Sequence, residues 1–220
     1  MHLQQTQVVE PKSGSIGRIA QLAPGVALPC ITMAFARNEE IFAEEEDADF
    51  VYQVISGAVR DVRGLSDGRR QIGAFHLSGD VFGLECGAAH RFSAEAVTDC
   101  KIALIRRSAL EKTAEADGAA ARQLWNLTVC ELQRLQEHLL LLGRKSAAER
   151  VALFLISMAE RGAAGEVVDL PMSRMDIADH LGLTIETVSR TMTQLERDHA
   201  ITMAGPRCVQ LHRRLALDLA

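Results

Sequence analysis

The sequence predicts an α+β protein in which an N-terminal β jelly roll, a long helix and a C-terminal winged helix-turn-helix follow one another. Residues 25–106 form short runs of alternating apolar and polar residues separated by turn signals, which favours a sandwich or jelly roll. Residues 117–143 change to the three- and four-residue spacing of a helix, and residues 173–194 predict two short helices around a glycine. We therefore divide the chain into a flexible arm (1–24), a barrel (25–116), a helix (117–143) and a winged helical domain (144–220).

The composition is that of an acidic chain of 220 residues with a net charge of −5 and 48% hydrophobic residues. No run of about 18 apolar residues occurs, so no membrane span is expected. The N-terminus lacks a basic-then-apolar export signal, which predicts a cytoplasmic protein. The net negative charge lies in residues 1–143, whereas residues 144–220 are neutral. The C-terminal domain can therefore bind a nucleic acid if its arginines cluster on one face.

Five cysteines stand at positions 30, 86, 100, 130 and 208, without a CxxC pair or another close ligand spacing. The sequence thus predicts neither a zinc site nor an iron–sulfur cluster. In a cytoplasmic protein these residues are expected to be reduced thiols, most of them buried. A redox role for Cys208 in the C-terminal domain stays open as an alternative.

The β region contains several runs that alternate in the manner of half-buried strands. Asp67-Gly68 and Gly79-Asp80 mark turns between such runs. The acidic stretch 44–47 is expected to be a solvated loop rather than a metal site. The clearest strand candidates are Phe50–Val59, Gln71–Leu77 and Cys100–Ile105.

The helix over 117–143 carries an apolar seam at the a and d spacing of a coiled coil, sustained for about three heptads. The same helix of a second copy of the chain would cover this seam, while flanking leucines such as Leu124 and Leu127 would contact the barrel. The alternative is that the whole stripe packs on the barrel of the same chain. The predicted dimer-interface residues are Trp125, Thr128, Leu132, Leu135, Leu139 and Leu142.

The segment from Gly143 onward begins a new unit. Gly143 is expected to end the long helix, and Ser146 with Glu149 forms a capping box for a helix over 147–161. Its apolar face should pack beneath the helix-turn-helix. A short strand at 167–171 is expected to lead into the helix-turn-helix. The runs 201–203 and 208–211 predict a β-hairpin that forms the wing, with Arg207 at its tip.

The helix-turn-helix is predicted over Ser173–Gln194. Ser173 with Asp176 resembles a capping box, and Gly182 stands where a helix C-cap favours positive φ. Small and apolar residues at Ala178 and Val188 would let the two helices cross closely. Thr191 occupies a position where a large aliphatic residue is usual in such motifs, and Met192 is expected to fill the space.

The outward face of the second helix carries Glu186, Ser189 and Arg190, which the spacing i, i+3, i+4 places on one stripe. Arginine can donate two hydrogen bonds to guanine, glutamate can accept one from cytosine, and serine can do either. The alternative is a solvated face with an intrahelical Glu186–Arg190 ion pair. Predicted contacts to DNA phosphates, which set register rather than base choice, are Ser173, Arg174, Thr184, Thr187 and Arg207.

The run E-T-V-S-R at Glu186–Arg190 resembles the recognition helix of the CRP/FNR family of bacterial transcription regulators. Ile185 and Ser189 stand where the cAMP-receptor branch carries arginine and glycine, so the resemblance points to the FNR and FixK branches. The absence of a cysteine cluster before Cys30 points further to FixK-like members. Four barrel segments in residues 51–95 strengthen the resemblance: V-Y-Q-V-I-S-G-A-V-R, D-G-R-R-Q-I-G-A-F, G-D-V-F-G-L-E and R-F-S-A-E-A.

This resemblance implies a cyclic-nucleotide-binding-like barrel and a homodimer that binds double-stranded DNA at a palindrome, TTGAT-N4-ATCAA. It also implies activation of transcription with RNA polymerase, in programmes for low oxygen, nitrogen oxide or nitrogen fixation. In nucleotide-binding relatives, a glutamate and an arginine of the barrel hold the ribose and the cyclic phosphate. Here Leu84 and Phe92 occupy those positions, and Arg91 is one residue off, so we expect no nucleotide and no other cofactor.

Two other functions stay open at this point. A ligand-gated sensor of the same fold could hold haem, with His76 or His138 as ligand, or another small molecule. A protein-interaction module could use the same helices to bind a partner protein. No Ser–His–Asp set, paired carboxylates or glycine-rich phosphate loop occurs, so no enzymatic activity is expected.

Overall fold

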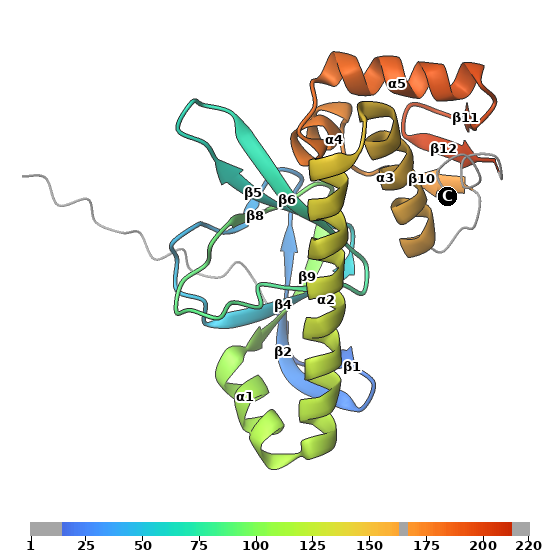
Figure 1. Cartoon of the computed structure of the whole chain (residues 1–220). Coiled ribbons are helices and arrows are strands. Elements are labelled where there is room, and N and C mark those ends of the chain that lie inside the picture. The colour runs from blue at the N-terminus through green and yellow to red at the C-terminus, as the bar shows by residue number, and fades with distance from the viewer. Residues whose placement is uncertain (1–14, 163–166, 213–220) are drawn as a thin grey trace, which may run out of the picture.

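The computed structural model describes residues 15–162 and 167–212. A β barrel lies beside one long helix, and a small α/β domain sits at one end of that helix (Figure 1). This arrangement confirms the predicted α+β class. Among the described residues, no helix combines the length and apolarity needed to cross a bilayer. The helices are α1 (Arg107–Ala116), α2 (Gly118–Arg144), α3 (Ala147–Arg161), α4 (Arg174–Leu181) and α5 (Ile185–Arg197).

Two antiparallel sheets form the barrel, with strand orders β1-β2-β9-β4-β7 and β3-β8-β5-β6. Successive side chains of a strand point to opposite faces, and the inward ones, such as Val54, Val59 and Ile102, are at most 1% exposed. The strands are β1 (Ser15–Ala23), β2 (Val26–Phe35), β3 (Glu40–Phe42), β4 (Phe50–Ser56), β5 (Ala58–Gly64), β6 (Arg70–Leu77), β7 (Val81–Phe82), β8 (Ser93–Ala96) and β9 (Cys100–Arg106).

Strand β1 corrects the predicted boundary of the flexible arm. The segment Ser15–Ala23 pairs with β2 instead of remaining loose to residue 24. Ala20 and Leu22 on this strand are buried, so their apolar side chains join the barrel core. The rest of the predicted arm, residues 1–14, lies outside the described residues.

The expected single strand Phe50–Val59 is divided at Gly57 into β4 and β5, which belong to different sheets. Gly57 has φ 91°, and a Cβ there would lie 2.5 Å from the carbonyl oxygen of Asp99. Glycine is therefore required where the chain passes from one sheet to the other.

Helix α1 was also not predicted, because it follows β9 without a side-chain cap at Arg106.

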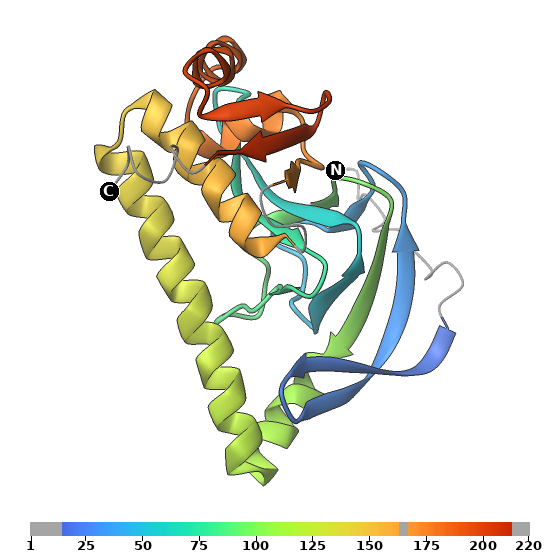
Figure 2. The same ribbon diagram turned by 90° about the vertical axis from the view of Figure 1, so that its right-hand side faces the viewer.

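Helix α2 runs along the barrel (Figures 1 and 2). Its apolar side chains form two adjacent stripes. Ala120, Leu124 and Leu127 on one stripe pack against the barrel core. The neighbouring stripe is the predicted seam, which is largely exposed. The helix continues through Gly143 to Arg144, one residue beyond its predicted end, and Lys145 is its C-cap.

Helix α3 begins at the predicted capping box and returns from the end of α2, so that the two helices form a V (Figure 2). Val151, Phe154, Leu155 and Met158 are buried, as predicted. They share one hydrophobic cluster with barrel residues of β5 and β6 and with the helix-turn-helix. The barrel and the C-terminal domain therefore have a continuous core.

Candidate nucleic-acid interface

Helices α4 and α5 form the predicted helix-turn-helix. The Ser173 hydroxyl accepts a hydrogen bond from the backbone N–H of Asp176 at 3.1 Å, and the Asp176 carboxylate accepts one from the backbone N–H of Ser173 at 2.9 Å. This is the expected capping box. Gly182 ends α4 in the left-handed conformation with φ 62°, which confirms its predicted role as the C-cap.

The two helices are held together by apolar side chains that face each other and α3. Ile177, Ala178 and Leu181 of α4 and Val188 and Met192 of α5 are each at most 3% exposed. Thr191 is only half-buried, whereas Met192 fills the interior position. The packing thus agrees with the prediction for a motif that lacks the usual aliphatic residue at position 191.

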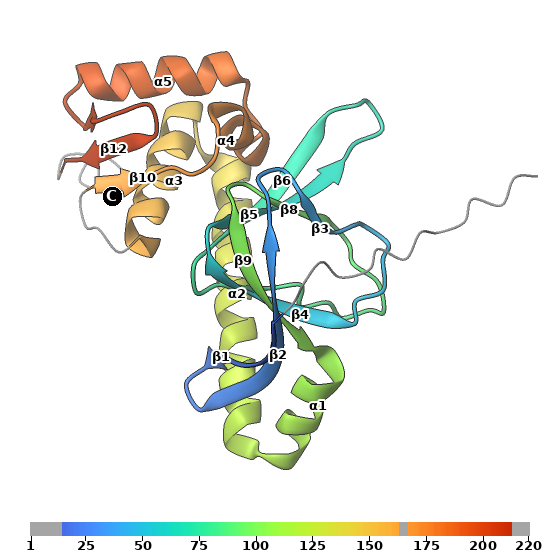
Figure 3. The same ribbon diagram turned by 180° about the vertical axis from the view of Figure 1, so that it is seen from behind.

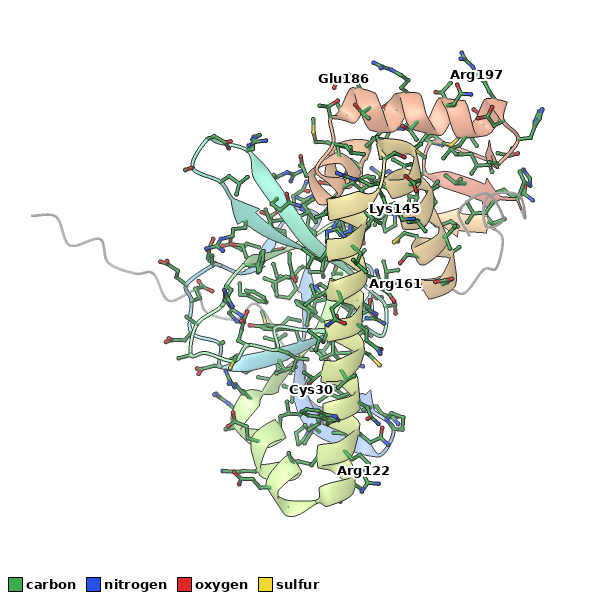
Figure 4. All side chains as sticks on the ribbon, viewed as in Figure 1. Cys30, Arg122, Lys145, Arg161, Glu186 and Arg197 are labelled. Atoms are coloured by element: carbon green, nitrogen blue, oxygen red, sulfur yellow. The ribbon has the colours of Figure 1, made fainter. Side chains whose placement is uncertain are left out.

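Helix α5 lies at the end of the molecule away from the barrel (Figures 3 and 4). Glu186 and Arg190 are exposed and Ser189 is half-buried. A hydrogen bond with its own backbone N–H, another with the Thr184 hydroxyl and the charge of Arg190 lower the pKa of Glu186. The stripe therefore presents an ionised acceptor, a hydroxyl and a guanidinium to the solvent.

The stripe extends beyond the residues that the sequence singled out. Thr193 and Arg197 follow Glu186 at i+7 and i+11, and both are exposed. Figure 4 shows Glu186 and Arg197 toward opposite ends of α5. Eleven residues of helix span about 16 Å, so Arg197 can contact DNA outside the bases near Glu186. Continuing the i, i+4, i+7, i+11 spacing past Arg190 was the signal that could have identified it.

Four of the five predicted phosphate contacts lie at helix N-termini, where free backbone N–H groups also favour anions. Thr184 is exposed and caps α5, its hydroxyl accepting from the backbone N–H of Thr187 at 3.2 Å. Arg174 is exposed at the first position of α4, next to Ser173. The Ser173 hydroxyl donates to Asp176 at 2.7 Å, so it is already bonded within the chain.

The fifth predicted phosphate contact is in the wing. Strands β10 (Val167–Asp169), β11 (Ile201–Met203) and β12 (Cys208–Leu211) form an antiparallel sheet in the order β10-β12-β11. The β11–β12 hairpin was predicted, whereas its pairing with β10 was not. Arg207 is exposed in the β11–β12 turn, and its guanidinium donates to the carbonyl of Pro171 at 3.4 Å. This contact draws the wing tip toward the segment that leads into α4.

A cluster of buried aromatic rings packs in the interior of the barrel. The rings of Phe42 and His90 stack with centroids 3.7 Å apart, and Tyr52 lies 4.9 Å from Phe42 and 5.2 Å from Phe82. All four side chains are buried, and burial lowers the pKa of His90. Phe42, Tyr52 and Phe82 thus form part of the apolar core of the barrel.

Leu84 and Phe92, which replace the glutamate and arginine of nucleotide-binding relatives, have different surroundings. The Leu84 side chain is 38% exposed. The Phe92 ring packs on Gly73, where a Cβ would lie 3.3 Å from it, and the Arg63 guanidinium stands 6.0 Å from its centroid. Arg91 precedes β8 and is exposed.

The candidate haem ligands have other contacts in this structure. His76 is buried, and its Nε2 lies 2.8 Å from a carboxylate oxygen of Asp61. His138 stacks on His180. In the described part of the chain, no group of three or more histidine, cysteine or acidic residues could hold a metal ion.

Of the cysteines, Cys86 and Cys130 are exposed, contrary to the expectation that most are buried, and Cys208 is half-buried.

Comparison with known proteins agrees with this architecture. A model of the cyclic nucleotide-binding domain matches residues 32–117, and one of the Crp-like helix-turn-helix domain matches residues 149–219. Nitrogen fixation regulation protein FixK of Azorhizobium caulinodans is 50% identical over 205 residues, which are 91% of this chain and 82% of that protein. Transcriptional activatory protein AadR of Rhodopseudomonas palustris is 42% identical over 84% of this chain and 80% of its own length.

A solved structure shares the whole arrangement. The structure of FixK2 from Bradyrhizobium japonicum superposes with a TM-score of 0.83 at 51% identity, covering 87% of this chain and 96% of that one. The relatives are regulators of transcription rather than enzymes, as the sequence predicted. The chain therefore belongs to the CRP/FNR family of transcription regulators and, within it, is similar to FixK proteins.

Proposed function

We propose that two copies of this chain bind the palindrome TTGAT-N4-ATCAA, each placing α5 in the major groove of one half-site. The exposed stripe of Glu186, Ser189 and Arg190 carries this proposal. Each half-site contains a single G·C pair. Arg190 donates to its guanine and Glu186 accepts from its cytosine, while Ser189 contacts a neighbouring base.

Contacts to the DNA backbone would surround this stripe. Arg174, Thr184 and Thr187 lie at the N-termini of α4 and α5, and Arg207 lies at the wing tip. Ser173 would bind a phosphate only by giving up its hydrogen bond to Asp176. These contacts supply affinity and register without base preference.

The homodimer would form through the seam of α2. Trp125, Leu132, Leu135 and Leu139 are 53–71% exposed, and Thr128 beside them is also exposed. Large apolar side chains at coiled-coil spacing on one exposed stripe favour pairing with an identical helix. Leu142 is half-buried within the chain, so we assign it the edge of the interface.

The protein would activate transcription together with RNA polymerase, in the cytoplasm, for genes of low-oxygen, nitrogen-oxide or nitrogen-fixation metabolism. The names of the relatives and the family resemblance support this assignment. The filled barrel supports activity without a cyclic nucleotide or another cofactor. The protein's own abundance would then control its activity.

A ligand-gated regulator is the second candidate, because a cavity of about 550 Å³ between α2, α3 and β6 is lined by both candidate haem ligands, His76 and His138. A visible absorption spectrum of the purified protein shows whether it holds haem, and so distinguishes a haem-gated regulator from an effector-free one. Haem binding would add a strong band near 400 nm, whereas we expect only the protein absorbance.

DNA binding by protein purified in air, without added ligand, tests the proposed function. We expect tight binding to TTGAT-N4-ATCAA and at least about a thousandfold weaker binding to a scrambled duplex at the same salt concentration. Folded, dimeric protein that treats the two duplexes alike would overturn the proposal of an effector-free regulator.

A further inference from the structure

The first helix of the helix-turn-helix is joined to the barrel by a cluster of charged side chains, which we call the interdomain clamp: Arg60 and Arg70 of the barrel with Asp176 and Asp179 of α4. Arg60 and Asp176 are 2.9 Å apart and, respectively, 8% and 4% exposed. Arg70 lies 2.6 Å from Asp176 and 2.7 Å from Asp179. Strands β5 and β6 thus hold α4 at Asp176 and Asp179.

The Asp176 carboxylate has two separate sets of partners. One oxygen accepts from Ser173 and caps α4, while the other accepts from Arg60 and Arg70. Burial acts to raise the pKa of Asp176, but the Ser173 hydrogen bonds and the two arginines lower it overall. Glu95 of β8 accepts from Arg60 at 2.6 Å and so fixes that arginine on the barrel side.

The C-terminal end of α4 is held by a different arginine. The Arg150 guanidinium donates to the carbonyls of Leu181 at 3.0 Å, Leu142 at 2.7 Å and Lys145 at 3.0 Å. It therefore joins the end of α4 to the end of α2. A helix of eight residues held at both ends cannot tilt relative to the barrel or to α2 without breaking these bonds.

This geometry links the dimer seam to the DNA-contacting helix. Helix α2 is fixed on the barrel by its apolar inner stripe, and the barrel holds α4 through the clamp. Helix α5 follows the motion of α4 because Ile177, Leu181 and Val188 lie in one buried core. In a dimer, the clamp of each copy would set the distance and rotation between the two α5 helices.

We propose that Arg60 and Arg70 are positioning residues that determine half-site spacing: they contact no base, yet they restrict the protein to palindromes with a four-base-pair spacer. This inference rests on the proposed function. Each added base pair moves a half-site by about 3.4 Å along the axis and rotates it by about 34°. Two C-terminal domains held rigidly on their barrels cannot follow that change, whereas two loosely held C-terminal domains can.

The test measures the affinity of full-length variants for TTGAT-Nx-ATCAA duplexes with spacers of three, four and five base pairs. Arg70→Met is the principal variant, because Arg70 is one-third exposed and its loss is compatible with folding. Arg60→Met is the second variant. Arg69→Met is the matched control, since Arg69 is the adjacent arginine but pairs only with Asp67 in its own turn.

We expect wild type and Arg69→Met to prefer the four-base-pair spacer by at least about thirtyfold, because a wrong spacer removes one half-site contact. Arg70→Met and Arg60→Met should reduce this preference to less than about fivefold while keeping the choice of TTGAT over scrambled half-sites. Circular dichroism and sedimentation verify folding and dimerisation, and Arg70→Met decides the outcome if Arg60→Met does not fold.

Two results would overturn the inference and differ from each other. If Arg70→Met weakens binding to all three spacers by the same factor, or leaves all three unchanged, the clamp has only a structural role. If wild type itself shows no preference for TTGAT half-sites, the proposed function fails, and the role in spacing fails with it.

Discussion

The imidazole of His138 on α2 stacks on the imidazole of His180 on α4, with ring centroids 4.2 Å apart and an interplanar angle of 17°. The Nδ1 of His180 also lies 3.1 Å from the carbonyl oxygen of Ile72 on β6. Burial, together with the neighbouring His138 and Arg161, lowers the pKa of His180 to about 3. Helix, barrel and helix-turn-helix therefore meet at a pair of neutral rings.

This pair makes stability depend on pH. The unfolded chain binds a proton at His180 below its ordinary pKa of about 6.5, whereas the folded chain does not until about pH 3, so acidification favours unfolding. Between pH 7 and pH 5 the loss should be about 2 kcal/mol. Urea denaturation of wild type and His180→Gln should show that the variant loses less over this range.

The control for the pH experiment is His199→Asn, which changes an exposed histidine in a left-handed turn that asparagine tolerates. It should retain the pH dependence of wild type. Equal pH dependence in wild type and His180→Gln would show that the buried ring does not set the acid limit of stability.

Arg190→Ala should weaken binding to the specific palindrome by about 1–3 kcal/mol per contact and relax the choice at one base pair of each half-site. The reason is that Arg190 is exposed on the outward stripe and donates two bonds in the plane of a guanine edge. Competition assays with all substitutions of the half-site measure the change. A uniform loss across all sequences would contradict base contact.

Arg207→Ala should weaken binding to every sequence by a similar factor and reduce the salt dependence, the slope of log K against log [salt], by about 1 per half-site. Arg207 lies at the wing tip, away from the α5 stripe, so it can neutralise a phosphate but cannot select a base. Titrations between 50 and 200 mM salt provide the slope. An altered base preference in this variant would assign the wing a different role.

Leu139→Glu should dissociate the dimer, because Leu139 is 71% exposed on the seam and a partner helix would have to bury the new charge. Leu140→Glu is the matched control: Leu140 is 65% exposed but is turned about 100° away from Leu139 around α2. Sedimentation equilibrium measures both. Dimers of equal strength in the two variants would place the interface elsewhere.

The sequence predicted best those elements whose ends are marked by local chemistry. The predicted caps placed α3 and α4 correctly, since a cap depends on neighbours within a few residues. These caps are Ser146 with Glu149, Ser173 with Asp176, and Gly182. Helix α1 has no side-chain cap at its start and was missed. Strand β1 was missed because its pairing with β2, a contact that its own sequence does not reveal, makes it a strand.

The candidate site shows the same difference between local patterns, which the sequence reveals, and distant contacts, which it does not. Glu186, Ser189 and Arg190 share a stripe by helical spacing alone, so the sequence was sufficient to group them. Arg60 and Asp176 are 116 positions apart, and neither residue has a local pattern that names the other. Periodicity predicts which face of an element is buried, but not which distant element covers it.

The continuous core between barrel and helix-turn-helix makes the boundary at residue 144 a poor place to cut the chain. Phe75 and Ile72 of β6 share that core with Phe154 of α3 and Ile177 of α4. A fragment that begins at residue 144 would expose the apolar surface that the barrel now covers. Chimaeras that exchange DNA-binding heads among relatives must therefore also transplant the matching face of β5 and β6. New binding specificities are then acquired more readily by changing the outward stripe of α5 than by exchanging whole domains.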